Sequence, residues 1–212
     1  MQPADIEAKL SRFAARFPND FLTTFDEAPE RPIASLSIEN GPASLRRDPV
    51  YQIGNPAEEI LHFHFLAGDL NGKAGDLLAC NAFLFYQFAV PVHTLAILLQ
   101  PENPTMFEDG QVHYSARPGR GSMFFHFETV AIADRLVEEL LSGPPATLPL
   151  AVLARLPVSG DEINGVRWIA QHIKQRCQSQ LPPDEARDIL DLARDLSGLR
   201  IPPEEADRIF LA

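Results

Sequence analysis

A strand, a helix and a second strand follow one another in the middle of the chain, and this succession constrains the fold most strongly. The segment EILHFHFLA (59–67) is apolar on both faces, as expected of a central strand. The apolar stretch from Asp76 to Phe88 is long enough to favour a buried helix, and PVHTLAILL (91–99) predicts another buried strand. A helix between two buried strands forms a β-α-β unit, whose crossover makes the strands parallel. We therefore expect an α/β fold.

Weaker patterns predict the elements on either side of this unit. Ile6, Leu10 and Phe13 recur at helical spacing and predict a helix over 5–17, which ends near Pro18. Turn residues at 40–42 separate two strand-like pieces, although a proline weakens the second. Further along we expect strands in GQVHYSARP and SMFFHFETVAI, and then helices near 160–178, 184–197 and 203–211.

These elements suggest two parts. Residues 1–157 are expected to form an α/β domain with a central mixed sheet flanked by helices. Residues 158–212 are expected to form a small helical C-terminal extension packed on it.

The charge of the chain limits its partners. A net charge of −11 and a pI near 4.9 should repel a phosphate backbone, which argues against a general nucleic-acid binder but not against an enzyme that meets DNA through metal ions. Cys80 and Cys177 have no zinc-ribbon spacing and suggest no disulfide framework, so a reducing, cytoplasmic setting fits best. The segment MQPADIEAKLSRF lacks the features of a signal peptide, and Pro91 divides the longest apolar stretch, so we expect no membrane partner.

His62 and His64 are the first candidate site. Residues two apart in a strand point to the same face, so both imidazoles could bind one transition metal. A third ligand would be required, and Asp48, His93 or Asp69 could supply it. The alternative is a pair of histidines that hydrogen-bond to neighbouring groups.

Two other sequence patterns do not indicate a binding or catalytic site. The segment PGRGS (118–122) lies between two strands and fits no phosphate-binding fingerprint, so we expect a hairpin turn. Glu58 and Glu59 are adjacent in a strand and therefore point to opposite faces, which argues against joint acid–base work.

Several segments together resemble a known family. The stretch LHFHFLAGDLNGKAGDLLACNAFLFYQFAVPVHTLAILLQPE, with FPNDFL before it and LARDLSGLRIPPEEADRIF after it, is similar to the bacterial recombination-promoting nuclease and transposase family. Asp5 and Lys9 also match an Asp-x-x-x-Lys near the start of that family. The family is a branch of the PD-(D/E)XK nuclease superfamily, so the resemblance implies a restriction-endonuclease-like core.

The resemblance also assigns roles to residues. In such enzymes an Asp on one strand and a Glu on the next hold Mg²⁺, and a Lys or Gln two residues after the Glu steadies the attacking water. Asp48 would be the metal carboxylate. His64 stands at the position of the Glu and Leu66 at that of the Lys or Gln, and neither supplies the required chemistry. In the next helix, positions where relatives carry Arg and Tyr are occupied by Gly75, Asp76, Ala79 and Cys80.

These replacements favour a catalytically degenerate nuclease fold without a cofactor. Such a protein would act through protein contacts, by pairing with itself or with a paralogous nuclease. One alternative is an active DNA endonuclease that uses Mg²⁺ or Mn²⁺, with Asp48 and a displaced acid such as Glu59. A second is a protein that holds a softer metal, Mn²⁺ or Zn²⁺, through Asp48, His62 and His64.

Overall fold

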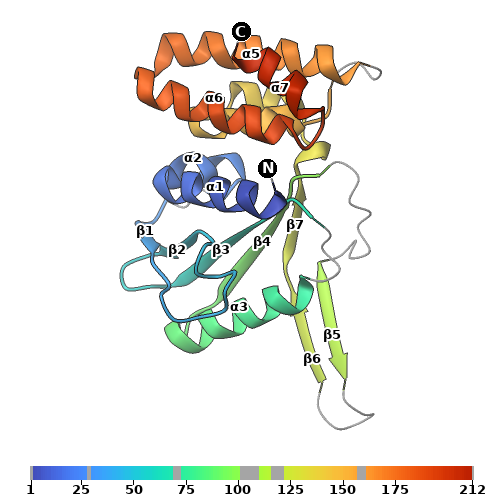
Figure 1. Ribbon diagram of the computed structural model, residues 1–212. Helices are drawn as coiled ribbons and strands as arrows, with labels where there is room; N and C mark the ends of the chain where they lie inside the picture. Colours follow the sequence, from blue (N-terminus) through green and yellow to red (C-terminus); the bar gives the residue numbers. More distant parts are fainter. Residues whose placement is uncertain are drawn as a thin grey trace. The chain divides into compact units, whose positions relative to one another are not determined.

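The computed structural model describes residues 2–27, 30–68, 73–100, 110–115, 122–156 and 161–211 (Figure 1). Its contacts group the chain into two compact units. The first unit is helical and the second contains the strands. The first consists of Met1–Ala28, Leu99–Pro101 and Ala131–Ala212, and the second of Pro29–Leu98 and Glu102–Val130.

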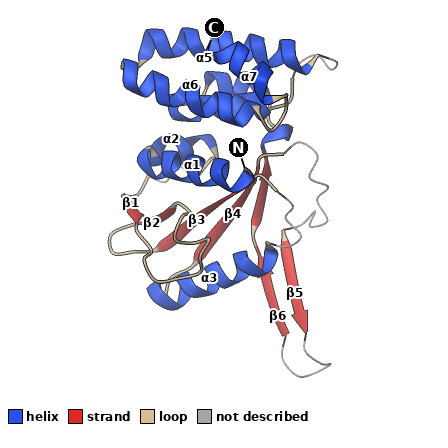
Figure 2. Cartoon of the chain, in the orientation of Figure 1, coloured by secondary structure: helices blue, strands red, loops and turns tan. Residues whose placement is uncertain are grey.

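A five-stranded mixed sheet forms the centre of the second unit (Figure 2). The edge strand β1 (Ile33–Leu36) pairs in antiparallel fashion with β2 (Val50–Ile53), and β2 pairs in the same way with β3 (Glu59–Leu66), whereas β3 and β4 (Val92–Leu98) are parallel. The α/β class and the mixed sheet are thus confirmed. In spatial order the strands are β1 (Ile33–Leu36), β2 (Val50–Ile53), β3 (Glu59–Leu66), β4 (Val92–Leu98) and β7 (Glu128–Ala131).

The predicted β-α-β unit is present in this sheet. Strand β3 is joined to β4 by helix α3 (Ala74–Phe88), and the parallel register runs from Ile60 opposite Val92 to Leu66 opposite Leu98. Every residue of β3 after Glu59 is buried. Both faces of the strand are therefore covered by protein, including the face that carries His62 and His64.

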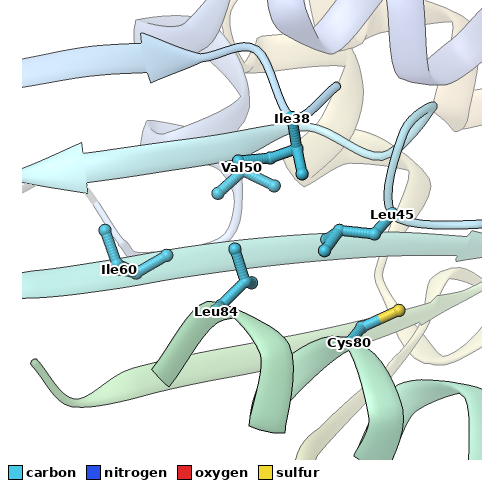
Figure 3. Close-up of a cluster of buried hydrophobic side chains, with 6 residues drawn as sticks. All are labelled: Ile38, Leu45, Val50, Ile60, Cys80 and Leu84. Carbon is cyan, nitrogen blue, oxygen red and sulfur yellow. The ribbon is translucent and has the colours of Figure 1, made fainter. Parts of the chain in front are cut away.

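Helix α3 packs one apolar side against the sheet. Leu77, Cys80 and Leu84 are buried at helical spacing, and the helix ends at Ala89 in a left-handed conformation. The cluster beneath the helix joins residues of α3, β2, β3 and the segment between β1 and β2 (Figure 3). It consists of Ile38, Leu45, Val50, Ile60, Cys80 and Leu84.

The predicted strand over SMFFHFETVAI is two strands. Its first half is β6 (Ser122–His126), which pairs with β5 (Gln111–Ser115) in a separate antiparallel sheet, while the second half is β7 of the main sheet. Phe127 lies between them and donates its N–H to the carbonyl of Gly110 at 2.7 Å. A side chain at Gly110 would collide with the Phe127 carbonyl, so a glycine is needed there. The expected turn at 118–121 lies outside the described residues.

Helices and short 3₁₀ segments make up the first unit. The four helices predicted from periodicity are present as α1, α5, α6 and α7, within a few residues of their expected ends. None of the helices in the described part of the chain is long and apolar enough to span a membrane. The elements are α1 (Pro3–Arg16), α2 (Pro18–Thr24), η2 (Ile132–Asp134), α4 (Val137–Ser142), η3 (Pro145–Leu153), α5 (Glu162–Gln180), α6 (Pro183–Ser197) and α7 (Pro203–Phe210).

Polar contacts join the two ends of the chain within this unit. Lys9 of α1 forms an ion pair with the buried carboxylate of Asp195 in α6. The Asp20 carboxylate accepts a hydrogen bond from the N–H of Ala146 at 2.9 Å. Residues 1–28 and 131–156 therefore belong with the C-terminal helices, whereas the sequence had suggested a division into 1–157 and 158–212.

Substitution of Phe63 tests how much the packing of the central strand contributes to the stability of the sheet unit. Its side chain is fully buried and meets the ring of Tyr51 edge-on, with 5.5 Å between centroids. Phe63→Ala should lower the free energy of unfolding by about 3–5 kcal/mol, because it leaves a cavity. Phe124→Ala, at a ring that is 62% exposed, should change it by less than about 0.5 kcal/mol. Urea titration followed by circular dichroism measures both, and equal losses would contradict this packing.

Candidate functional site

His62 and His64 lie on one face of the central strand. They alternate with Leu61, Phe63 and Phe65, as the strand period requires. His62 is fully buried, and 5% of the surface of His64 is exposed. Polar groups at such depth need hydrogen-bond partners, because water cannot reach them.

Asp48 is brought to this face by the turn that precedes β2. The N–H groups of Arg47 and Asp48 both donate to the carbonyl of Ser44, at 2.9 and 3.2 Å. At the end of the turn, the carbonyl of Pro49 accepts a hydrogen bond from the N–H of Phe63 at 3.0 Å. Asp48 is thereby fixed beside β3, and only 8% of its side chain is exposed.

One carboxylate oxygen serves both histidines. Oδ2 of Asp48 lies 3.0 Å from Nε2 of His62 and 2.7 Å from Nδ1 of His64. A neutral imidazole carries one N–H, so each ring donates to Asp48 when its proton is on the nitrogen that faces the carboxylate. The arrangement satisfies a buried negative charge with two donors.

These bonds also affect protonation. Burial, the strongest influence, acts to raise the pKa of Asp48, but the hydrogen bonds from His62 and His64 outweigh it and hold the pKa below its usual value. Burial lowers the pKa of His62, and the bond to Asp48 opposes this only in part. The site therefore favours an ionised Asp48 beside a neutral His62.

The outer nitrogens of the two rings have no such partner. His62 Nδ1 and His64 Nε2 are buried, and neither forms a hydrogen bond within the described part of the chain. Asp48 is thus the sole hydrogen-bond partner that these residues provide to either ring.

Leu66 and Glu59 do not complete a catalytic group. Leu66 is fully buried on the same strand face as His64 and offers an apolar side chain only. Glu59 alternates onto the other face, lies about 16 Å along the strand from His64, and faces Arg31 Nη2 at 3.4 Å. Glu59 as a metal ligand beside Asp48 was a wrong prediction, because the strand period and its length separate them.

The other predicted third ligands are not at this site. His93 is opposite Leu61 in the parallel register, on the face away from His62, and its Nε2 lies 3.3 Å from a carboxylate oxygen of Glu128. Asp69 lies outside the described residues. Of the three proposed partners, Asp48 is the one that the structure brings to the histidine pair.

Helix α3 contributes polar groups that the sequence pattern did not single out. Asn81 donates to the Thr94 hydroxyl and to the Val92 carbonyl, both at 3.1 Å. Ser44 Oγ lies 3.3 Å from Cys80 Sγ, and burial raises the pKa of this thiol. The available signal for Asn81 was an amide in the middle of the helix, between apolar residues on either side.

The four positions of α3 that the family resemblance singled out carry no positive charge. Gly75, Asp76 and Ala79 are exposed there, whereas Cys80 is buried. The exposed positions therefore offer no cation to a phosphate group.

Comparison with known proteins finds no match to this chain among family models, curated proteins or solved structures. The family resemblance therefore stays a prediction that depends on the quoted segments.

Replacement of Asp48 tests whether it holds this part of the sheet together. Asp48→Ala leaves the N–H groups of two buried rings without an acceptor, at about 1–3 kcal/mol each, so the free energy of unfolding should fall by about 2–6 kcal/mol. Asp184→Ala is the matched control, because its side chain is 95% exposed, and it should cost less than about 1 kcal/mol. Urea unfolding at neutral pH in the presence of a chelator measures both variants. A loss at Asp48 no larger than at Asp184 would contradict the shared role of its carboxylate.

Proposed function

We propose that the chain is a catalytically degenerate relative of the PD-(D/E)XK nucleases and acts through protein contacts. The observation that carries the proposal is His64, which stands where the second carboxylate would be required and makes a 2.7 Å contact with Asp48. The first carboxylate is thus engaged by an imidazole on the next strand.

The order of strands supports the family assignment. Asp48 lies just before β2, and His64 and Leu66 lie on its antiparallel neighbour β3, which is followed by α3 and the parallel strand β4. The family places its Asp and its Glu-x-Lys/Gln group on two successive strands in the same way. We therefore assign a restriction-endonuclease-like core to the second unit.

The cluster of Asp48, His62 and His64 lacks side chains that phosphodiester hydrolysis requires. Mg²⁺ prefers oxygen ligands, and Asp48 is the carboxylate among the three side chains that converge here. Leu66 cannot orient water, since its side chain has neither a donor nor an acceptor. A net charge of −11 further opposes the approach of DNA.

Access to the group is also restricted. The Asp48 and His64 side chains are 8% and 6% exposed, whereas a metal nuclease must bring its ion to a phosphate in the substrate. An active enzyme with Glu59 as a displaced acid would need that residue on the other face of β3. The alternative of an active nuclease is therefore the weaker one.

Helix α3 offers a surface for protein contacts. Asp76 is its one charged residue, and two large side chains near its end, Phe85 and Tyr86, are 58% and 88% exposed. Adjacent large aromatic side chains that are exposed on a helix are typical of a surface covered by another protein. A second copy of the chain or a paralogous nuclease would cover it.

A plasmid-nicking assay tests the loss of catalysis. The purified protein with Mg²⁺ or Mn²⁺ should leave supercoiled DNA intact at every enzyme concentration, because one carboxylate cannot hold the ion productively. Asp48→Ala serves as the control for contaminating nuclease. Nicking by the wild type that disappears in Asp48→Ala would overturn the proposal.

Sedimentation velocity tests self-pairing through α3. The wild type should sediment as a concentration-dependent dimer of the 23.5 kDa chain, and the double variant Phe85→Ser/Tyr86→Ser should shift toward the monomer by at least about tenfold in dissociation constant. Leu211→Ser removes another exposed apolar side chain, 67% exposed, and should leave the dimer unchanged. A wild type that stays monomeric, or a double variant that dimerises as well as the wild type, would contradict self-pairing.

A further inference from the structure

We propose that Asp48, His62 and His64 form a buried site for one divalent transition metal, with Zn²⁺ as the best-matched ion. One ligand atom from each residue lies within 4.8 Å of the other two. This inference does not depend on the nuclease assignment, because it uses only the three side chains and their positions.

The distances suit a single ion. Zn²⁺ binds imidazole nitrogen at about 2.0–2.1 Å and carboxylate oxygen at about 2.0–2.2 Å, so two ligands of one ion are about 3.0–3.5 Å apart at angles between octahedral and tetrahedral values. Asp48 Oδ2 lies 3.0 Å from His62 Nε2 and 2.7 Å from His64 Nδ1. A small outward movement of the three groups would therefore admit the ion.

The donor set selects the class of metal. Two imidazoles and one carboxylate favour Zn²⁺ and similar transition metals, while Mg²⁺ and Ca²⁺ prefer sites made of oxygen. Cys80 is not among the clustered ligand atoms, and its sulfur contacts Ser44. We expect nitrogen and oxygen ligands without a thiolate.

Binding would use the carboxylate of Asp48 and, on each histidine, the ring nitrogen that faces it, and these atoms bind a metal only without a proton. On binding, each ring proton must move to the outer nitrogen, where the described residues offer no acceptor. Absence of such partners weakens comparable sites by about 10–100-fold, so we expect a weaker affinity than that of a site with a complete outer shell.

The ion would have a structural role in this position. It would connect the turn that carries Asp48 to the central strand that carries both histidines. Its ligands are at most 8% exposed, so exchange with solvent would require the turn to open. A metal held in this way stabilises the sheet unit by an amount that rises with the logarithm of the free metal concentration above the dissociation constant.

Equilibrium dialysis with elemental analysis tests the site in the full chain. After removal of metals by a chelator, the wild type should retain about one Zn²⁺ per chain in the presence of excess Mg²⁺. Asp48→Ala and His64→Ala should retain at least about tenfold less at limiting Zn²⁺. His113→Gln, on the exposed part of β5, should retain as much as the wild type. A wild type without Zn²⁺, or variants at the site that retain as much as the wild type, would overturn the proposal.

Two further variants guard against loss of binding through unfolding. His64→Glu keeps a ligand atom at the position, so it should still bind metal but shift its preference from Zn²⁺ toward Mn²⁺. Cys80→Ser should leave both the stoichiometry and the absorption spectrum of the Co²⁺-loaded protein unchanged, because no sulfur binds the ion. An unchanged preference in folded His64→Glu, or a thiolate-to-Co²⁺ band in the wild type, would contradict the ligand set.

Zn²⁺ retention and plasmid nicking together show which of the two proposals fails, the metal site or the loss of catalysis. Zn²⁺ retention without nicking supports both proposals, and retention with nicking that depends on Asp48 overturns only the loss of catalysis. Absence of both retention and nicking overturns only the metal site.

Discussion

Parallel pairing of β3 with β4 is the constraint on which the rest of the sheet unit depends. Two parallel strands cannot be joined by a tight turn, so the chain between them must cross one face of the sheet, and α3 makes that crossing. The buried side of the helix closes over β3 through Leu77, Cys80 and Leu84. Any polar side chain that β3 carries must then find its partner inside the protein.

The two histidines of β3 meet this requirement through a single carboxylate. Asp48 is supplied by a turn whose own backbone bonds fix its position, and its Oδ2 accepts from both rings. The same contacts that satisfy the buried rings occupy the carboxylate that a nuclease would use for Mg²⁺. The proposed loss of catalysis and the burial of these three side chains would thus both follow from one arrangement.

The strongest local patterns predicted their elements well. Strand β3, helix α3 and strand β4 lie within a few residues of the ranges expected from the sequence, because their apolar runs and the breaks between them are unambiguous. The segment 122–132 was expected as one strand, but the bond between Phe127 and Gly110 divides it between two sheets. A pairing partner that is distant in sequence leaves no mark on the periodicity of the strand.

The sequence by itself determined that His62 and His64 share a face, because side chains alternate along any strand. It also excluded a second carboxylate and a water-positioning amine at 64 and 66, since residue type settles that chemistry. Only the tertiary structure decided that Asp48, rather than His93 or Glu59, completes the group. The physical reason is that strand register and the shape of a turn bring residues 48, 62 and 64 together, and both depend on contacts between segments that are far apart in the chain.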